Sequence, residues 1–146
     1  MKTAIVSSDS YEKHLTGDGH PEQPKRVLSI KKKLKIRKDL IWCKPEKVPQ
    51  ELLEITHSKN YIKHISDSFP IEGLKFLDGD TVISPGSKQA VYDAAGSVIR
   101  AINGIENKEF KNAFCVARPP GHHAEKNKAM GFCVLNQAGL ALNYLV

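Results

Sequence analysis

The most informative stretch of this sequence is RPPGHHAEKNKAMGFCVLN, residues 118–136. It follows the apolar run NAFCVA, residues 112–117, which is typical of a strand buried on both faces in a parallel sheet. Two prolines fix φ at successive positions and Gly121 admits backbone angles closed to other residues, so we expect His122 and His123 in one rigid geometry. A histidine held in this way can take a proton from water and return it to a leaving group. The stretch therefore predicts a general acid–base pair at the carboxyl edge of a sheet, where α/β proteins place their sites.

The rest of the chain alternates between short strands and helices. Apolar, β-rich runs predict strands over residues 3–7, 40–43 and 112–117. Helical spacing predicts helices over residues 24–36, from Pro49, from Ser58, from Pro85 and over residues 131–146. Between them we expect loops at residues 9–23, 68–81 and 118–130. Such alternation predicts an α/β fold with a mostly parallel sheet.

The longest predicted helix has the clearest start signal. Ser84 is its expected N-cap, Pro85 its first residue, and Asn103 with Gly104 its end. The final segment, residues 131–146, is nearly all apolar, and we expect it to be a buried helix without a cap at the chain end.

Basic residues are concentrated on one predicted helix. The chain has 22 Lys+Arg against 16 Asp+Glu, a formal charge of +6, and the segment from Lys25 to Lys38 has eight basic residues and no acidic one. We expect Val27, Ile30 and Leu34 to form the buried face of this helix, and its lysines to be solvated. Nucleic-acid binding ranks last among the possible functions, because aromatic residues make up only 7% of the chain and none interrupts the basic run.

Length and composition favour one ordinary globular domain. A chain of 146 residues suits a single domain, and 40% hydrophobic with 26% charged residues excludes a largely disordered one. We find neither a signal peptide nor an apolar stretch near the ~20 residues that span a bilayer, so we expect no membrane association. The three cysteines, Cys43, Cys115 and Cys133, show no CxxC spacing, which favours a reducing, cytoplasmic location.

Three further motifs occur in order before the histidine segment. They are GHP with PKR in residues 19–26, THS with YI in residues 56–62, and LDGDTVISPGS, residues 77–87. Together with RPPGHHAEKNKAMGFCVLN they resemble the zinc-dependent histone deacetylases and their bacterial relatives, the acetylpolyamine amidohydrolases and acetoin-utilisation proteins, especially those of class II. The resemblance covers nearly the whole chain. It implies a three-layer α/β/α fold of the arginase/deacetylase type, of which residues 1–146 would be the N-terminal portion of a single domain.

The resemblance also implies a reaction and roles for individual residues. The family hydrolyses acetylated amines, such as acetyl-lysine or acetylpolyamines, to free amine and acetate, and Zn²⁺ polarises the acetyl carbonyl. By this resemblance His123 would be the general base and acid, and His122 its electrostatic partner. The implied substrate-binding residues are Gly131 and Phe132 along a narrow tunnel, Cys133 beneath it, and Arg26 at the pocket floor.

The sequence departs from the family at the metal site. The family's zinc ligands, an Asp-x-His pair and a later Asp, lie beyond residue 146, and we name no metal ligand within the chain. His57 and His64 we interpret as ordinary, partly buried histidines. We therefore expect the N-terminal part of a deacetylase, which has the histidine pair but binds no zinc and is inactive alone. Its expected partners are an acetylated amine and either a complementary C-terminal half or a second copy.

Two alternatives remain open. A non-catalytic deacetylase-like module could self-associate or bind a partner through apolar faces left exposed. A cysteine hydrolase could use Cys133 with His122 or His123, although a buried, inert cysteine is the more common case.

Overall fold

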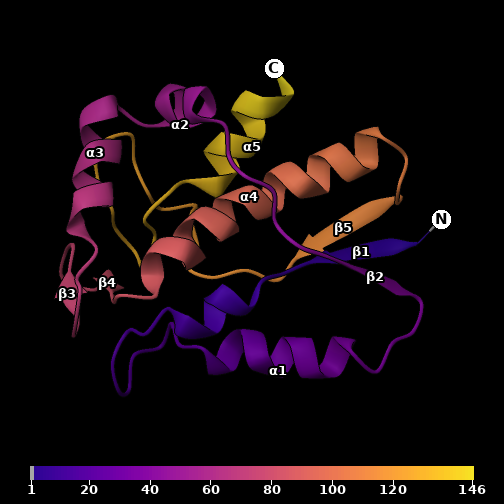
Figure 1. The fold of residues 1–146 in the computed structure, drawn as a ribbon, viewed down its shortest axis with the longest axis horizontal. Coiled ribbons are helices and arrows are strands. Elements are labelled where there is room, and N and C mark those ends of the chain that lie inside the picture. Colours follow the sequence, from indigo (N-terminus) through magenta and orange to yellow (C-terminus); the bar gives the residue numbers. More distant parts are fainter. Residues whose placement is uncertain (1) are drawn as a thin grey trace.

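A parallel sheet forms the centre of the structure, a computed structural model that describes residues 2–146. Its strands β1 (Thr3–Val6), β2 (Leu40–Cys43) and β5 (Asn112–Cys115) lie in the order β2-β1-β5 (Figure 1). Val6 pairs with Cys43 on one side and with Cys115 on the other, so the three strands end level with one another. The predicted parallel sheet is confirmed, and its carboxyl edge is where the site must be sought.

Helices on both faces of the sheet complete three layers. α1 (Lys25–Leu34) lies on one face and α4 (Ser87–Glu106) on the other (Figure 1). A short 3-10 helix, η1 (Asp9–Lys13), follows β1 and packs against both of them. Tyr11 of η1 is fully buried in a cluster with Ile5, Val27, Ala90 and Ala94. The α/β/α arrangement predicted from the family resemblance is thus present.

A second, larger core lies beside the sheet. α5 (Gln137–Leu145) packs against α4 and against α2 (Gln50–Thr56), which contacts α3 (Lys59–Ser68). Their buried side chains, which include Leu53, Ile65 and Leu140, form one cluster with residues of α4. Of the helices in residues 2–146, none is long and apolar enough to cross a membrane.

The buried face of α1 differs from the prediction. Val27 is buried as expected, but Ile30 is 38% exposed and Lys31 takes the buried position. The Lys31 ammonium donates to Asp9 Oδ1 at 2.9 Å and to Glu12 Oε1 at 2.8 Å. A lysine is tolerated there because both carboxylates come from η1, which the sequence pattern did not predict.

α4 begins and ends later than predicted. Gly86 is its N-cap rather than Ser84, whose N–H donates to the Ser87 hydroxyl at 2.7 Å. The helix also continues through the predicted stop at residues 103–104 and ends at Glu106. Gly104 is buried inside the helix, under the ring of Phe110. A Cβ at that position would collide with the ring, so the position requires glycine.

Three other predictions need correction. The sequence predicts a strand buried on both faces at residues 112–117, but β5 is an edge strand and Phe114 is 51% exposed. The sequence predicts a buried helix over residues 131–146, but only 137–145 are helical and Leu142 is 67% exposed. The predicted loop 68–81 contains β3 (Lys75–Phe76), which pairs antiparallel with β4 (Val82–Ile83).

Candidate active site

A buried arginine fixes the segment that leaves β5. Arg118 is 1% exposed, and its Nε and Nη2 donate to the two carboxylate oxygens of Glu22 at 2.9 and 2.7 Å. Its Nη1 donates to the backbone carbonyls of Tyr11 and His14. A bidentate pair of this kind compensates both buried charges. It also ties the loop that carries the two histidines to the loop that precedes α1.

Glu22 is held ionised beneath the site. Burial alone would raise the pKa of its carboxyl, but hydrogen bonds from His14 and Arg118 outweigh that effect and lower the pKa to about 2. Burial lowers the pKa of His14, which lies 3.5 Å from the same carboxylate. Glu22 is therefore ionised at neutral pH, and its charge is balanced mainly by Arg118.

Two glycines allow close packing of the backbone around the histidine loop. A Cβ on Gly121 would lie 1.2 Å from Oε1 of Gln137, so a side chain has no room there. Gly131 has φ +57°, and a Cβ on it would lie 2.9 Å from Cβ of His123. The rings of His122 and His123 have their centroids 4.1 Å apart, and both residues are exposed.

One open pocket of about 590 Å³ gathers most of the predicted site residues. Its lining includes His122, His123, Gly131, Phe132 and Arg26, together with Pro21, Glu22, Asp80 and Pro120. The volume lies within the range of small-molecule sites. Arg26, which the resemblance puts at the pocket floor, contributes an exposed wall: its side chain is 58% exposed and Nη1 lies 3.2 Å from Oε1 of Glu22.

Phe132 forms the aromatic wall of this pocket. Its φ is +69°, an unusual value for a bulky residue, and its N–H donates to Oγ1 of Thr81 at 3.1 Å. Its ring meets the ring of His20 edge-on, with centroids 5.0 Å apart. His20 in turn bonds the carbonyl of Asp80 through Nε2 at 3.0 Å. Contacts from two distant segments thus maintain the strained backbone of Phe132.

Cys133 lies behind the pocket wall. It is fully buried, its Sγ is 3.3 Å from the Gly131 carbonyl oxygen, and burial raises the pKa of its thiol. A nucleophilic cysteine needs an accessible thiolate with a lowered pKa. The cysteine-hydrolase alternative therefore has no support in this geometry, and Cys133 is a packing residue beneath Gly131 and Phe132.

His57 anchors the site segment from behind and is fully buried, whereas the sequence suggests a partly buried residue. Its Nε2 accepts the Asn136 N–H at 3.0 Å, and its Nδ1 lies 2.9 Å from the Glu125 carbonyl, so the proton resides on Nδ1. Burial lowers the pKa of His57 and favours this neutral form. The α2–α3 junction thereby holds both ends of residues 125–136. His64 is exposed on α3.

A zinc site does not fit the described residues alone. Within residues 2–146, no group of three or more His, Cys, Asp or Glu side chains is arranged to hold a metal ion. The pocket offers the imidazoles of His122 and His123, but Glu22 is already bound by Arg118. Zinc sites in enzymes use three protein ligands, which this pocket does not assemble.

The sequence pattern did not single out Glu22 or Asp80 as pocket residues. Glu22 lies between the GHP and PKR motifs of residues 19–26, and Asp80 lies within LDGDTVISPGS, residues 77–87. Their position in these motifs is the sequence feature that could have identified them as pocket residues. The role of Glu22 depends on Arg118, 96 residues later in the chain, a contact that no local pattern reports. Asp80 also lines an adjoining hollow of about 460 Å³ with Asp78 and His123.

Comparisons with known proteins agree with this geometry. The family model described as "Histone deacetylase domain" matches residues 20–146. An uncharacterized protein of Synechocystis sp. is 36% identical over 150 residues, covering 97% of this chain and 48% of that protein. A probable deacetylase of Archaeoglobus fulgidus is 32% identical over 151 residues, covering 100% of this chain and 42% of that protein.

A solved structure shows the same fold. The HDA15 HD domain aligns with a TM-score of 0.88 and 26% sequence identity, over 97% of this chain and 42% of that chain. The chain thus spans about half or less of the length of these relatives. Every residue that lines the histidine pocket, from Pro21 to Phe132, falls inside the matched range. The chain accordingly belongs to the histone deacetylase family.

Proposed function

We propose that residues 1–146 form the N-terminal part of a zinc-dependent deacetylase domain and supply its proton-transfer histidines and one wall of its acyl pocket. The observation that carries this proposal is the convergence of His122, His123, Gly131 and Phe132 on one pocket. The substrate class is an acetylated amine, such as acetyl-lysine or an acetylpolyamine. A cytoplasmic location remains part of the proposal and is supported by three free cysteines.

In this proposal the two histidines move and balance the proton. His123 accepts a proton from the attacking water and returns it to the leaving amine, a role worth about 10²–10⁴-fold in rate. His122, with its ring centroid 4.1 Å away, adds positive charge beside the oxygen that becomes negative in the transition state. Gly131 and Phe132 provide the apolar wall against which the alkyl chain of the acetylated amine lies.

The metal would come to this pocket with other residues. Zn²⁺ supplies polarisation of the acetyl carbonyl in such domains. Because residues 2–146 assemble no three-ligand set, we assign the ligands to polypeptide outside this segment. We expect the 146-residue chain alone to retain no zinc after dialysis against a weak chelator and to release no acetate, with elemental mass spectrometry as the readout for zinc.

A chimera tests the proposed roles. Residues 1–146 would replace the corresponding segment of the Archaeoglobus fulgidus probable deacetylase, and acetate release from an acetyl-lysine peptide and an acetylpolyamine would be measured. We expect zinc-dependent hydrolysis, and we expect His123→Ala to lower kcat by about 100-fold or more. His64→Ala is the matched control, because His64 is an exposed histidine on α3, and it should leave kcat unchanged.

Either of two results would contradict the proposal. One is a folded, zinc-loaded chimera without acetate release. The other is a chimera in which His123→Ala and His64→Ala behave alike. Circular dichroism of each variant separates these outcomes from simple misfolding.

A specific observation favours a second candidate, a non-catalytic module that self-associates. The edge strand β5 exposes Phe114, and α5 exposes Leu142 and Leu145 by 67% and 60%. Exposed apolar groups on an edge strand and on a terminal helix are typical of surfaces that bind another polypeptide.

A further inference from the structure

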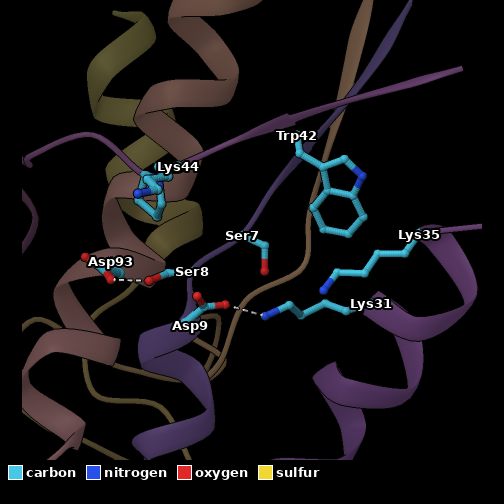
Figure 2. Close-up of a pocket in the computed structure, with 9 residues that line it drawn as sticks. Ser7, Ser8, Asp9, Lys31, Lys35, Trp42, Lys44 and Asp93 are labelled. Atoms are coloured by element: carbon cyan, nitrogen blue, oxygen red, sulfur yellow. Dashed lines mark hydrogen bonds and ion pairs between the residues drawn. The ribbon is translucent and has the colours of Figure 1, made fainter. Parts of the chain in front are cut away.

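A second pocket lies at the same edge of the sheet, on the opposite side of β1 from the histidine loop. Its volume is about 510 Å³, and it shares no lining residue with the histidine pocket. We call it the β1–β2 pocket, because Ser7 and Ser8 follow β1 and Lys44 follows β2, while Lys35 comes from the end of α1 and Asp93 from α4 (Figure 2). The carboxyl ends of parallel strands are the usual location for ligands in α/β folds.

Two ammonium groups of this pocket are uncommitted. Lys31 is neutralised by Asp9 and Glu12, but within residues 2–146 the side chains of Lys35 and Lys44 form neither an ion pair nor a hydrogen bond. The hydrogen bond from Lys31 lowers the pKa of Asp9, and the charges of Lys35 and Lys44 lower it further.

The remaining carboxylate of the pocket is already satisfied. Asp93 accepts hydrogen bonds from Ser8 at 2.7 Å, from Ser10 at 2.6 Å and from Gln89 at 2.7 Å. Because Glu12 also pairs with Lys31, the three lysines of the lining face three carboxylates, and within residues 2–146 the ammonium groups without an ion pair are those of Lys35 and Lys44. An anionic ligand would find amines without partners and would displace none of the existing ion pairs.

An aromatic ring completes the lining. Trp42 is 38% exposed and is the single tryptophan of the chain. In Figure 2 its indole ring is directed toward the gap that the amines of Lys31 and Lys35 enter from the opposite side. A planar ring can stack on an exposed indole, a contact worth about 1–3 kcal/mol for a nucleobase.

We propose that the β1–β2 pocket binds a nucleoside monophosphate, whose base stacks on Trp42 and whose phosphate pairs with Lys35. The pocket is large enough for a ligand of this size. Lys44 adds a second ammonium group without an ion pair from the β2 side, and the Ser7 hydroxyl oxygen, which donates to the Val116 carbonyl, can accept from the sugar. This site is separate from the proposed deacetylation chemistry and does not depend on it.

Intrinsic fluorescence tests the proposal directly, because Trp42 reports on this pocket alone. The 146-residue chain would be titrated with adenosine monophosphate, with adenosine, and with inorganic phosphate, and each titration repeated by calorimetry. We expect saturable quenching by adenosine monophosphate and weaker binding of the other two probes. Lys35→Ala should weaken binding at least about tenfold, as expected for loss of a charge-assisted contact.

Lys33→Ala is the matched control, since Lys33 is an exposed lysine on the same helix and does not line the pocket. It should change the affinity less than about twofold. Equal loss in both variants would indicate diffuse charge attraction and overturn the proposal. Equal binding of phosphate, equal binding of adenosine, or no saturation would also overturn it. In Trp42→Leu, calorimetry should show that the preference for the nucleotide over phosphate is lost.

Discussion

Glu22 and Arg118 link two loops that are far apart in sequence, and the position of the histidine pair depends on them. The side chains of Glu22 and Arg118 are each 1% exposed. The Glu22 carboxylate also lies close to His14 Nε2 and to the exposed guanidinium of Arg26. A buried ion pair contributes little net stability when intact, but its disruption leaves a buried charge without a partner. The two residues should therefore be sensitive to substitution although neither carries out chemistry.

Glu22→Gln should lower the free energy of unfolding by about 3–5 kcal/mol near neutral pH, because Arg118 would remain buried without its counterion. The folded pKa of about 2 lies below the ordinary value of 4.5. The stabilisation from ionised Glu22 is thus complete above pH 4.5 and is lost as the pH falls toward 2. Urea denaturation should show the difference between wild type and variant shrinking over that interval.

The exposed Glu51 of α2 provides the control for this prediction. Glu51→Gln should change the unfolding free energy by less than about 0.5 kcal/mol at any of these pH values. If the difference in unfolding free energy between wild type and Glu22→Gln stays constant between pH 4.5 and 2, the ionised carboxylate of Glu22 is not the source of the stabilisation.

Among the elements, the junction of α2 and α3 supports the site without touching it. His57 is the C-cap of α2, and its Nε2 accepts the N–H of Asn136, which is the N-cap of α5. Ser58 caps α3 by accepting from the Tyr61 N–H, and the Tyr61 hydroxyl donates to the Val134 carbonyl at 2.7 Å. One junction thus holds the segment behind Gly131 and Phe132 through two separate hydrogen bonds.

His57→Ala should destabilise the chain by about 1–3 kcal/mol for each buried group left unpaired. Hydrogen exchange should be faster at the Asn136 amide in this variant, which a general loss of helix propensity would not produce. His64→Ala, at an exposed position on the adjacent helix, should leave both measurements near wild type. An unchanged exchange rate at Asn136 would argue against the anchoring role of His57.

The packing of α4 depends on a glycine inside the helix. A Cβ on Gly96 would lie 1.8 Å from the carbonyl oxygen of Glu46, in the segment between β2 and α2. Gly96→Ala should therefore destabilise the fold by about 1–3 kcal/mol, although alanine is the better helix former by about 1 kcal/mol. Thermal unfolding measures this, with Gly79→Ala as the control because nothing lies within 4 Å of a Cβ there. A stabilised Gly96→Ala would mean that the two segments do not pack this closely.

At the scale of the whole described segment, residues 2–146, the sheet has an exposed edge at β5. Among the strands of residues 2–146, β5 pairs with β1 alone, and its Phe114 side chain is half exposed. An edge strand with apolar side chains pairs readily with other polypeptide unless charges or loops protect it. The exposed edge of β5 could bind the rest of a deacetylase domain, as in the first proposal, or a second copy of the chain, as in the self-associating alternative.

Phe114→Lys should reduce concentration-dependent self-association of the 146-residue chain, because a lysine on an edge strand opposes pairing. Sedimentation velocity over a range of concentrations measures the effect. Ile71→Lys adds the same charge at a side chain that is 98% exposed and lies away from the sheet, and it should leave association unchanged. If both variants associate like wild type, β5 is not the surface that self-associates.

Local signals were sufficient where an element depends on its own residues. The strand over residues 40–43 was predicted with the observed bounds, because an apolar run stops at Lys44 and Pro45. The start of a helix at Ser58 was also predicted correctly, since a serine hydroxyl can accept from the N–H three residues on without help from the rest of the fold. The family motifs likewise indicated the three-layer fold and the histidine-bearing loop.

Tertiary structure alone decided the features that depend on partners distant in the chain. Lys31 is buried because η1 places two carboxylates beside it, and β5 is an edge strand because of the order in which the strands assemble. Glu22 can form part of the pocket wall because Arg118, 96 residues later in the chain, donates to its buried carboxylate. The sequence by itself determined the main strands and helices and which loop holds the histidines, since these follow from local periodicity and backbone chemistry, but it did not predict η1 or the β3–β4 pair. Burial and charge compensation were settled only by folding, because they depend on contacts between residues that the chain brings together from far apart.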